Sequence, residues 1–485
     1  MARVVVLGAG VSGHTAALHL RRKLGRKHDV VVVTPNSQWN WIPSNIWVGV
    51  GKMTTEQVTF PLAPIYARKG IEFHQALAVA IHPEGDATRK RGFVEITYTD
   101  PAKTGTPGQI EYDYVINATG PKLNFAATPG LGPDGNTVSV CTPGHAVVAA
   151  KEFKEVIAKL KQGIAQTLVV GVGHGTCTCE GAAFEYAFNV EHELTLAGVR
   201  ELATLIYLTN EYELGDFGVG GMTFTQSGFE TTSKIWTESL FRERNMHAIL
   251  QAHVEKVEAG VIHYEQLDGV KKTLNFDFAM LLPPFRGVDL KAFNAQGEEI
   301  TSEMFAPNGF MKVDANYSPK PFEEWRAEDW PSTYQSPLYA NIFGVGIAFA
   351  PPHQISRPRK SETGVVIAPS PPRTGMPSGV MGKTVALTIC DRIEHGESAK
   401  AHVASMANMG AACVASAGSG MRTGTAAAMT MYPVVPDYQR FPGTGRSTED
   451  TFGEIGLAGH WIKYLLHVMF IYKAKARLGW FLIPE

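Results

Sequence analysis

The chain has 485 residues, of which 44% are hydrophobic and 19% are charged, so it is long enough for two or three packed domains and is not disordered. Its 44 Lys and Arg residues nearly balance 46 Asp and Glu residues, and the net charge of -2 gives no field that attracts nucleic acid. Five cysteines are too few for a disulfide framework in a chain of this length, so we expect them to act as individual thiols.

The chain begins MARVVVLGAG, in which a β-branched strand runs directly into a glycine turn. Because this leaves no room for a signal peptide ahead of the fold, we expect the protein to stay in the cytoplasm after synthesis. No window holds the roughly 20 apolar residues that a membrane-spanning helix needs.

The first glycine turn is Gly8-Ala-Gly10-Val-Ser-Gly13, which follows a predicted strand and precedes an Ala-rich helical stretch. In such a turn the first glycine permits the tight bend, the second lets the backbone approach a pyrophosphate, and the third allows close helix-strand packing. The usual acidic ribose ligand is missing, because the second strand ends with Thr34 and Asn36. We therefore predict a bound dinucleotide whose ribose is held by neutral groups.

A second glycine turn lies in the stretch TLVVGVGHGTCTCEGAAFE, which begins at Thr167. His174, Cys177 and Cys179 crowd the predicted helix start, where a pyrophosphate would otherwise bind. A helix N-terminus favours the thiolate form of cysteine, so this turn is predicted to present sulfur instead of binding phosphate. The alternative is that both cysteines are small buried residues, since free cysteine is among the most buried residue types.

A further cysteine, Cys141, lies in the stretch SVCTPGHA, four residues before His145. If a short helix begins there, the thiol and the imidazole lie on one helix face. This pair is a second candidate for thiol chemistry.

The C-terminal third differs in composition from the rest of the chain. Residues 316–380 are rich in Pro, Gly and Ser, which is typical of a loop packed near a site or mobile over one. The last segment is predicted to be a helix that lies in a membrane interface, since an apolar and aromatic stripe runs beside basic residues. The alternative is a terminal helix that covers an apolar core. The stripe consists of Trp461, Leu465, Val468 and Tyr472, and the basic residues are Lys463, Lys473, Lys475 and Arg477.

These patterns predict an α/β protein with two Rossmann-like domains and a C-terminal membrane-associating region. Each glycine turn is followed later by an apolar strand in the corresponding place, YDYVINATGPKL and FDFAMLLPPFRG. The expected domains are a first dinucleotide-binding domain (1–125 and 285–395), a second Rossmann-like domain that carries cysteines (126–284), and a membrane region (396–485).

From end to end the sequence resembles the sulfide:quinone oxidoreductases, flavoproteins with two dinucleotide-binding domains. The matching stretches stand in family order, and several together are more specific than any one of them. Besides the first glycine turn and the Cys141 segment they are WIPSNIWVGVGK, ATGPKL, CEGAAFEYAF, GDFGVGG, ANIFGVGIAFAPP, TGMPSGVMGK and the segment that contains Cys413.

The resemblance implies a glutathione-reductase-like fold for FAD or NAD(P), with FAD as the cofactor and no metal. It makes the domain of residues 1–125 and 285–395 the FAD-binding domain, gives residues 126–284 the redox cysteines, and makes residues 396–485 the membrane and quinone region. It implies that Cys141 lies beside the flavin ring, that Cys179 is the second redox cysteine, and that His145 is their acid/base neighbour. A lysine, Lys383, is expected at the N-terminus of a helix that faces the flavin, unless it is an ordinary solvated side chain. The cofactor-binding residues implied are Gly8, Gly10, Gly13, Thr34, Pro43, Ser44, Asn45, Gly120, Gly346 and Lys383.

Three differences from the pattern of the family suggest that the chain is a divergent subtype. Many members of the family carry a third cysteine where this chain has Ala348, and a second family histidine is replaced by Asp216. The loop 353–373 is longer than in many relatives. Cys177 is a reserve thiol for the missing cysteine, whereas Cys390 and Cys413 have apolar neighbours and are expected to be structural.

The implied reaction begins when hydrosulfide attacks an oxidised sulfur that links or caps Cys141 and Cys179, and two electrons reach FAD. A membrane quinone then reoxidises the flavin in an apolar channel formed by the C-terminal region, while sulfur leaves as polysulfide. Peripheral, monotopic membrane binding and a homo-oligomer are expected. The alternatives are a flavocytochrome-type sulfide dehydrogenase, a type II NADH:quinone oxidoreductase and a non-catalytic flavoprotein subunit.

Overall fold

A computed structural model describes residues 1–226, 228–372, 375–418, 420–422 and 424–485. Its larger sheet has eight strands in the order β21-β8-β1-β2-β5-β6-β7, with β20 paired beside β5. The strands from β21 to β5 run parallel, and β6 and β7 continue the sheet in antiparallel pairing. The bounds are β1 (Arg3–Leu7), β2 (Asp29–Thr34), β5 (Glu72–His82), β6 (Phe93–Tyr98), β7 (Pro107–Glu111), β8 (Tyr114–Asn117), β20 (Lys291–Ala292) and β21 (Ile342–Gly344).

The second sheet is smaller and entirely parallel, in the order β14-β11-β10-β18. Residues 168–172 of its strand β10 are apolar and buried, as expected for a parallel strand that is covered on both faces. An antiparallel sheet of β15, β16 and β17 precedes β18 in the chain. The bounds are β10 (Gln166–Val172), β11 (Ala203–Leu208), β14 (His247–Ile249), β15 (His253–Glu258), β16 (Val261–Glu265), β17 (Lys271–Asn275) and β18 (Phe278–Leu282).

Each parallel sheet has the same opening unit, a strand, a glycine turn and a helix. In the larger sheet β1 leads into α1 (Val11–Leu24), and in the smaller sheet β10 leads into α6 (Glu180–Leu196). The prediction of an α/β fold with two Rossmann-like units is confirmed. The strands of the larger sheet come from both sides of the second unit in the chain, but the domain boundaries given above remain a prediction.

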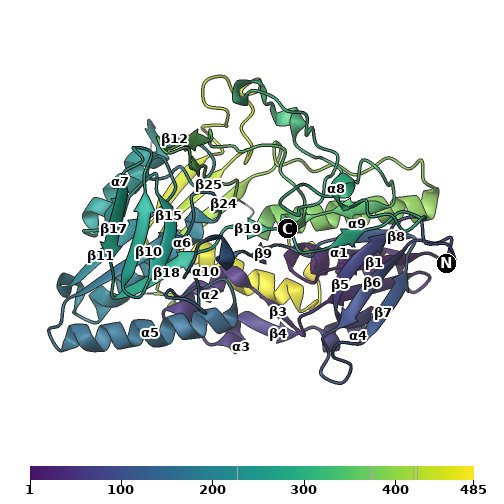
Figure 1. Cartoon of the computed structure of the whole chain (residues 1–485), viewed down its shortest axis with the longest axis horizontal. Coiled ribbons are helices and arrows are strands. Elements are labelled where there is room, and N and C mark those ends of the chain that lie inside the picture. Colours follow the sequence, from purple (N-terminus) through teal and green to yellow (C-terminus); the bar gives the residue numbers. More distant parts are fainter. Residues whose placement is uncertain (227, 373–374, 419, 423) are drawn as a thin grey trace.

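The C-terminal part joins the two units (Figure 1). The long helix α9 (Gly375–His395) packs along α1, and the antiparallel sheet of β24 (Ala411–Ala417), β25 (Thr425–Met431) and β26 (Phe452–Ile455) packs on α6. The last long helix, α10 (Leu457–Ala474), covers that sheet and lies between the two units in Figure 1.

Shorter elements complete the fold and connect the sheets. They are β3 (Gln38–Asn40), η1 (Ile42–Ser44), α2 (Asn45–Gly49), α3 (Thr55–Val58), β4 (Thr59–Pro61), α4 (Ala63–Lys69), β9 (Lys122–Leu123), α5 (Pro143–Lys161), β12 (Thr223–Gln226), β13 (Phe229–Thr232), α7 (Ser233–Glu243), β19 (Phe285–Arg286), α8 (Thr301–Met304), β22 (Arg359–Lys360) and β23 (Val366–Ile367). No helix within the described chain is long and apolar enough to cross a bilayer.

Candidate functional site

The first glycine turn leaves an open space at the start of α1. A Cβ on Gly8, whose φ is +96°, would lie 2.1 Å from the carbonyl oxygen of Ala118, and a Cβ on Gly13 would lie 2.1 Å from that of Gly8. A Cβ on Gly10 would meet nothing within 4 Å. Gly10 is also the N-cap of α1 and has no side-chain cap, so the amides of the first turn face an uncovered space that suits an anion.

Other predicted cofactor residues lie around this space. Gly120 follows β8, the strand next to β1, and a Cβ there would also meet nothing within 4 Å. Gly346 has a φ of +65°, and its Cβ would lie 2.1 Å from Oγ of Ser12 on α1. Thr34 is buried at the end of β2. These residues therefore fit a bound dinucleotide such as FAD.

The predicted place of Lys383 is wrong. Helix α9 begins at Gly375, so Lys383 lies in the third turn and not at the N-terminus. There its charge, together with that of Lys473, opposes protonation of His19. The prediction was wrong because the glycines of this stretch lie inside the helix and do not mark its start. Thr374, in the same motif, lies outside the described residues.

The second glycine turn has the same strand and helix around it, but its space is filled. Gly171 lies inside β10 beside Leu208 of β11, so the turn itself begins at Gly173, whose Cβ would lie 2.5 Å from the side chain of Leu131. A Cβ on Gly175 would lie 2.8 Å from the carbonyl oxygen of Val366. The turn that would bind a second pyrophosphate is therefore packed against protein.

The filling segment is residues 365–371, which we call the strap. The amide of Ala368 donates to the carbonyl of Gly175 over 2.8 Å, and the amide of Ser370 donates to that of Cys177 over 2.9 Å. The hydroxyl of Thr178 donates in turn to the carbonyl of Pro371 over 3.0 Å. The strap belongs to the Pro- and Ser-rich loop that the sequence placed near a site, and its described part is hydrogen-bonded across the turn.

Cys177 and Cys179 occupy different environments in this turn. Cys177 is fully buried, its thiol donates to the carbonyl of Leu282 over 3.2 Å, and burial raises its pKa well above the ordinary value. Cys179 is partly exposed and is the N-cap of α6, with a left-handed φ of 71°. A non-glycine residue in this conformation is strained, and such strain is concentrated at functional sites. The geometry favours Cys179 over Cys177 as the reacting thiol.

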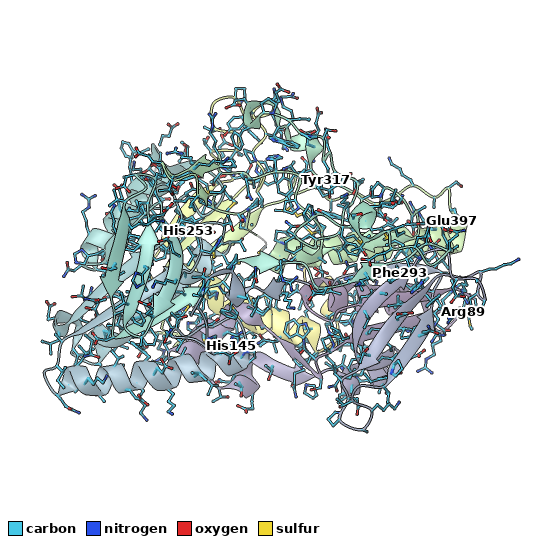
Figure 2. All side chains as sticks on the ribbon, in the orientation of Figure 1. Arg89, His145, His253, Phe293, Tyr317 and Glu397 are labelled. Carbon is cyan, nitrogen blue, oxygen red and sulfur yellow. The ribbon has the colours of Figure 1, made fainter. Side chains whose placement is uncertain are left out.

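Cys141 lies just before helix α5, whose N-cap is Thr142. Burial raises the pKa of Cys141 to about 11, although hydrogen bonding of its side chain with Ser139 acts in the opposite direction. His145 lies in the first turn of α5, at the end of that helix nearest the middle of the molecule (Figure 2). Burial lowers the pKa of His145, and within the described residues its Nδ1 has no hydrogen-bond partner. His145 is therefore a neutral imidazole with an unused acceptor.

Helix α2 links the elements that carry these cysteines. A Cβ on Gly49 would lie 2.7 Å from the side chain of Val140, the residue before Cys141, and 2.9 Å from the ring of Tyr186 on α6. The hydroxyl of Tyr186 also donates to the carbonyl of Gly49 over 3.0 Å. Pro43, Ser44 and Asn45, the predicted flavin neighbours, lead directly into α2, and the last two are fully buried.

Buried carboxyl groups near the second turn were not predicted. Glu180, the residue after Cys179, is fully buried, and Glu211 beside it accepts hydrogen bonds from Tyr207, Thr209 and the amide of Phe217. Burial raises the pKa of Glu211 to about 7. Asp216, which replaces a family histidine, is buried and bonded to the hydroxyl of Ser356. The only sequence signal was the unusual number of acidic residues after β11.

Helix α10 has polar groups on its inner face and apolar groups on its outer face. The inner residues are His460, Lys463, His467 and Lys473, which are 0, 6, 8 and 4% exposed. The outer residues are Trp461, Leu465 and Val468, which are 51, 56 and 47% exposed. Lys463 and Lys473 are thus not at an interface as the sequence suggested, because Lys463 pairs with Glu185 and Lys473 with Glu485.

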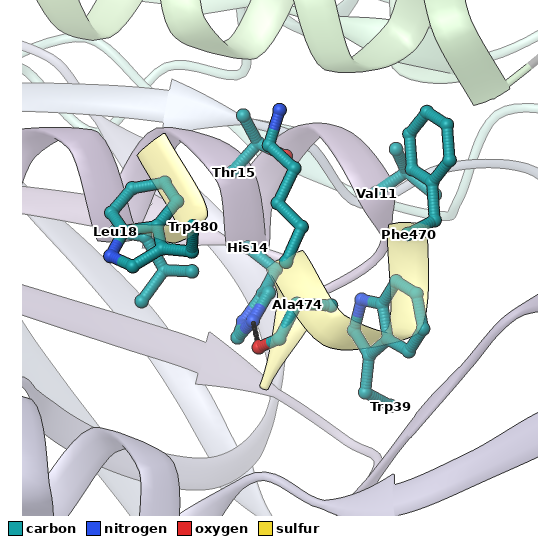
Figure 3. Close-up of a pocket in the computed structure, with 9 residues that line it drawn as sticks. Val11, His14, Thr15, Leu18, Trp39, Phe470, Ala474 and Trp480 are labelled. Carbon is teal, nitrogen blue, oxygen red and sulfur yellow. Dashed lines mark hydrogen bonds between the residues drawn. The ribbon is translucent and has the colours of Figure 1, made fainter. Parts of the chain in front are cut away.

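The second half of α10 docks on α1 around a small cavity (Figure 3). Nε2 of His14 is bonded to the carbonyl of Ala474 over 2.7 Å, and burial lowers the pKa of His14 to about 4. The residues that line the cavity are Val11, His14, Thr15, Leu18, Trp39, Phe470, Lys473, Ala474 and Trp480. The C-terminal helix is therefore anchored on the helix of the first glycine turn.

Two Rossmann-like units, one with an open turn and one with a closed turn that carries cysteine, define a dinucleotide-dependent oxidoreductase. Residues 2–317 match the family described as "Pyridine nucleotide-disulphide oxidoreductase", and the chain belongs to this family. FAD, the cofactor expected from the sequence, is the cofactor of such flavoproteins.

The most informative relatives confirm the resemblance seen in the sequence. The sulfide-quinone reductase of Aquifex aeolicus is 28% identical over 97% of this chain and 91% of its own length. The crystal structure of the sulfide:quinone oxidoreductase from Aquifex aeolicus superimposes with a TM-score of 0.74 at 27% identity, over 98% of this chain and 92% of that chain. NDH2 of Plasmodium falciparum in complex with NADH has a TM-score of 0.63 at 13% identity, over 99% of this chain and 97% of that chain, which shows a shared fold.

Proposed function

We propose that this chain oxidises sulfide with bound FAD and passes the electrons to a membrane quinone. The observation that carries the proposal is the strap, because it occupies the place where NADH would bind and leaves Cys179 at the head of α6. A type II NADH:quinone oxidoreductase needs that place open. The match to sulfide-quinone reductase over almost the whole chain supports the same conclusion.

FAD would be held by the open turn at Gly8, Gly10 and Gly13, by Gly120 and Gly346, and it would accept the electron pair that leaves sulfur. The protein's own part is thiol chemistry. Hydrosulfide attacks an oxidised sulfur that links or caps Cys141 and Cys179, a persulfide forms on one cysteine, and the other leaves as thiolate. Loss of two electrons and one proton from this pair re-forms the link with the extra sulfur in it, and a second hydrosulfide removes that sulfur as polysulfide.

His145 is suited to accept the proton that sulfide oxidation releases. Oxidation of hydrosulfide to the level of elemental sulfur frees one proton and two electrons. While its sulfur is linked or capped, Cys141 is no thiolate and cannot serve as the acceptor. The neutral imidazole four residues later has an unused Nδ1, as general base catalysis requires.

The outer face of α10 supports peripheral membrane binding. Three large apolar residues of this helix are exposed, while its charged residues face the protein interior. A helix on a water-exposed surface has the opposite arrangement. Leu478 and Leu482, which follow the helix, are 95 and 76% exposed. Replacing Leu465 by Glu is expected to reduce co-sedimentation with anionic lipid vesicles about tenfold, whereas Leu202→Glu, far from α10 in sequence and also exposed, should not.

The direct test of the function is sulfide-dependent reduction of a short-tail quinone by the purified, FAD-loaded protein. We expect turnover with sulfide and none with NADH. Turnover with NADH alone would exclude the proposal, and flavin reduction by sulfide without quinone turnover would favour a flavocytochrome-type dehydrogenase. Failure of sulfide and NADH alike to reduce the flavin would indicate a non-catalytic subunit. A homo-oligomer also remains a prediction, which analytical ultracentrifugation tests.

A further inference from the structure

The inner face of α10 carries one histidine whose partner lies in the segment expected beside the flavin. Buried polar groups are costly unless they are bonded, and all four inner groups of α10 have partners. Lys463 pairs with Glu185, Lys473 with Glu485, and His460 with Ser416 and the carbonyl of Gly420. The fourth, His467, is bonded through Nδ1 to the hydroxyl of Ser44 over 2.8 Å.

Ser44 lies where α10 meets the segment next to the predicted flavin. It is fully buried and immediately precedes α2, the helix that touches both cysteine-bearing elements. Trp41, in the same segment, stacks on Phe470 of α10 with ring centroids 4.5 Å apart, and a Cβ on Gly375 would lie 3.5 Å from its ring. The Ser44–His467 pair therefore joins α10 to the segment before α2, three residues from the tryptophan that contacts the start of α9.

The groups that face His467 keep its imidazole neutral. The ring of Trp47 from α2 packs edge-on at 5.9 Å, and Tyr464 and Lys463 lie one turn earlier on α10. Burial and the charge of Lys463 lower the pKa of His467 to about 4. A neutral imidazole can accept a proton at one nitrogen while it donates from the other, which suits a relay through a dry region.

We propose that the Ser44–His467 pair carries a proton from solvent to the quinone as it is reduced. The inference rests on the proposed function. Conversion of a quinone to a quinol consumes two electrons and two protons, of which reduced FAD provides both electrons and one proton. The second proton passes through His467 and the hydroxyl of Ser44 to the quinone oxygen, and solvent restores it to His467. Ser44 and His467 are 0 and 8% exposed, so the pair would supply that proton where bulk water does not reach.

The test separates the two half-reactions by stopped-flow absorbance of the FAD-loaded protein. In His467→Ala we expect reoxidation by a short-tail quinone to slow by about 100-fold, with reduction by sulfide unchanged within about twofold. Added imidazole should restore part of the rate, and a solvent deuterium effect of about 2 or more should appear on reoxidation only. Ser44→Ala should slow the same step, and His460→Gln on the same helix face is the matched control.

A second readout does not depend on turnover. In the oxidised protein labelled with ¹⁵N-histidine, the Nδ1 resonance of His467 should move in Ser44→Ala, and His467 should stay neutral down to about pH 5. Fast reoxidation in both His467→Ala and Ser44→Ala would overturn the inference, as would an unchanged Nδ1 resonance. If sulfide fails to reduce the wild type, the proposed function fails instead, and the resonance still tests the pair.

Discussion

The two glycine turns of this protein begin from the same strand, turn and helix, yet one is open and the other is closed. At the first, a Cβ on Gly10 would meet nothing within 4 Å. At the second, the strap bonds across the turn, with Ser370 and Thr176 separated by 194 residues in the chain. A glycine motif therefore specifies a backbone path, while packing from distant sequence decides whether a nucleotide can bind there.

The largest expected effect concerns the thiol that the closed turn presents. Replacing Cys179 by Ala should slow reduction of the flavin by sulfide about 10³-fold or more, because no other group at this position can form the persulfide. The rate is measured anaerobically from the loss of flavin absorbance. Cys177→Ala is the matched control, since the thiol of Cys177 is buried against a carbonyl, and we expect a change of less than about threefold. If both variants slow reduction of the flavin equally, Cys179 is not the reacting thiol in preference to Cys177.

A pair of glycine variants tests the open and closed turns directly. Gly175→Ala should lower the free energy of unfolding by about 1–3 kcal/mol, because its Cβ would lie 2.8 Å from the carbonyl oxygen of Val366 in the strap. Gly10→Ala has room and an ordinary φ of -70°, so the stability of the FAD-free protein should stay within about 0.5 kcal/mol.

Gly10→Ala, which should leave the stability unchanged, should weaken the binding of FAD. A methyl group at Gly10 enters the space where the pyrophosphate is expected, so the dissociation constant should rise about tenfold or more. Flavin fluorescence titration measures it. Unchanged affinity in Gly10→Ala would show that the open space is not the cofactor site.

Local patterns in the sequence were enough to predict the two units and the outline of the site. The buried runs VVVL and LVVG, each followed by glycines, predict strand and turn wherever they occur, because those elements depend on neighbouring residues. The place of Cys179 at the head of α6 followed from the same spacing. The residue roles at the site remain predictions.

What the sequence could not predict depends on contacts between distant segments. The strap looked like any Pro-rich loop, and only the fold shows that it closes the second turn. Lys463 and Lys473 looked like interfacial basic residues, because a helical pattern does not show which face meets Glu185 or Glu485. Lys383 was misplaced because the start of α9 was not evident from its glycines.

The smallest expected effect concerns the buried carboxyl groups behind the closed turn. The pKa of Glu211 is about 7 in the folded protein and near 4.5 in the unfolded chain, so the folded state binds more protons between these values. Its stabilising contribution is therefore complete below about pH 4.5 and is lost as the pH rises to about 7. In Glu211→Gln the loss of stability from pH 5 to pH 8, measured by urea unfolding, should be about 1–2 kcal/mol smaller than in the wild type.

The matched control for that titration is Glu213→Gln, since Glu213 forms a half-exposed pair with Lys234. This variant removes an exposed carboxyl of the same segment and leaves the buried carboxyl in place. If the stability of Glu211→Gln falls between pH 5 and pH 8 as much as that of the wild type, burial does not raise the pKa of Glu211 in the folded protein.

The central claim is that cysteine sulfur has replaced a nicotinamide as the electron donor to the flavin. Anaerobic mixing of the oxidised, FAD-loaded protein with sulfide or with NADH at equal concentration tests it most directly, with absorbance near 450 nm as the readout. We predict rapid bleaching by sulfide and none by NADH on the same timescale. Bleaching by NADH at a comparable rate would mean that the second turn binds the nucleotide despite the strap, and would contradict the account.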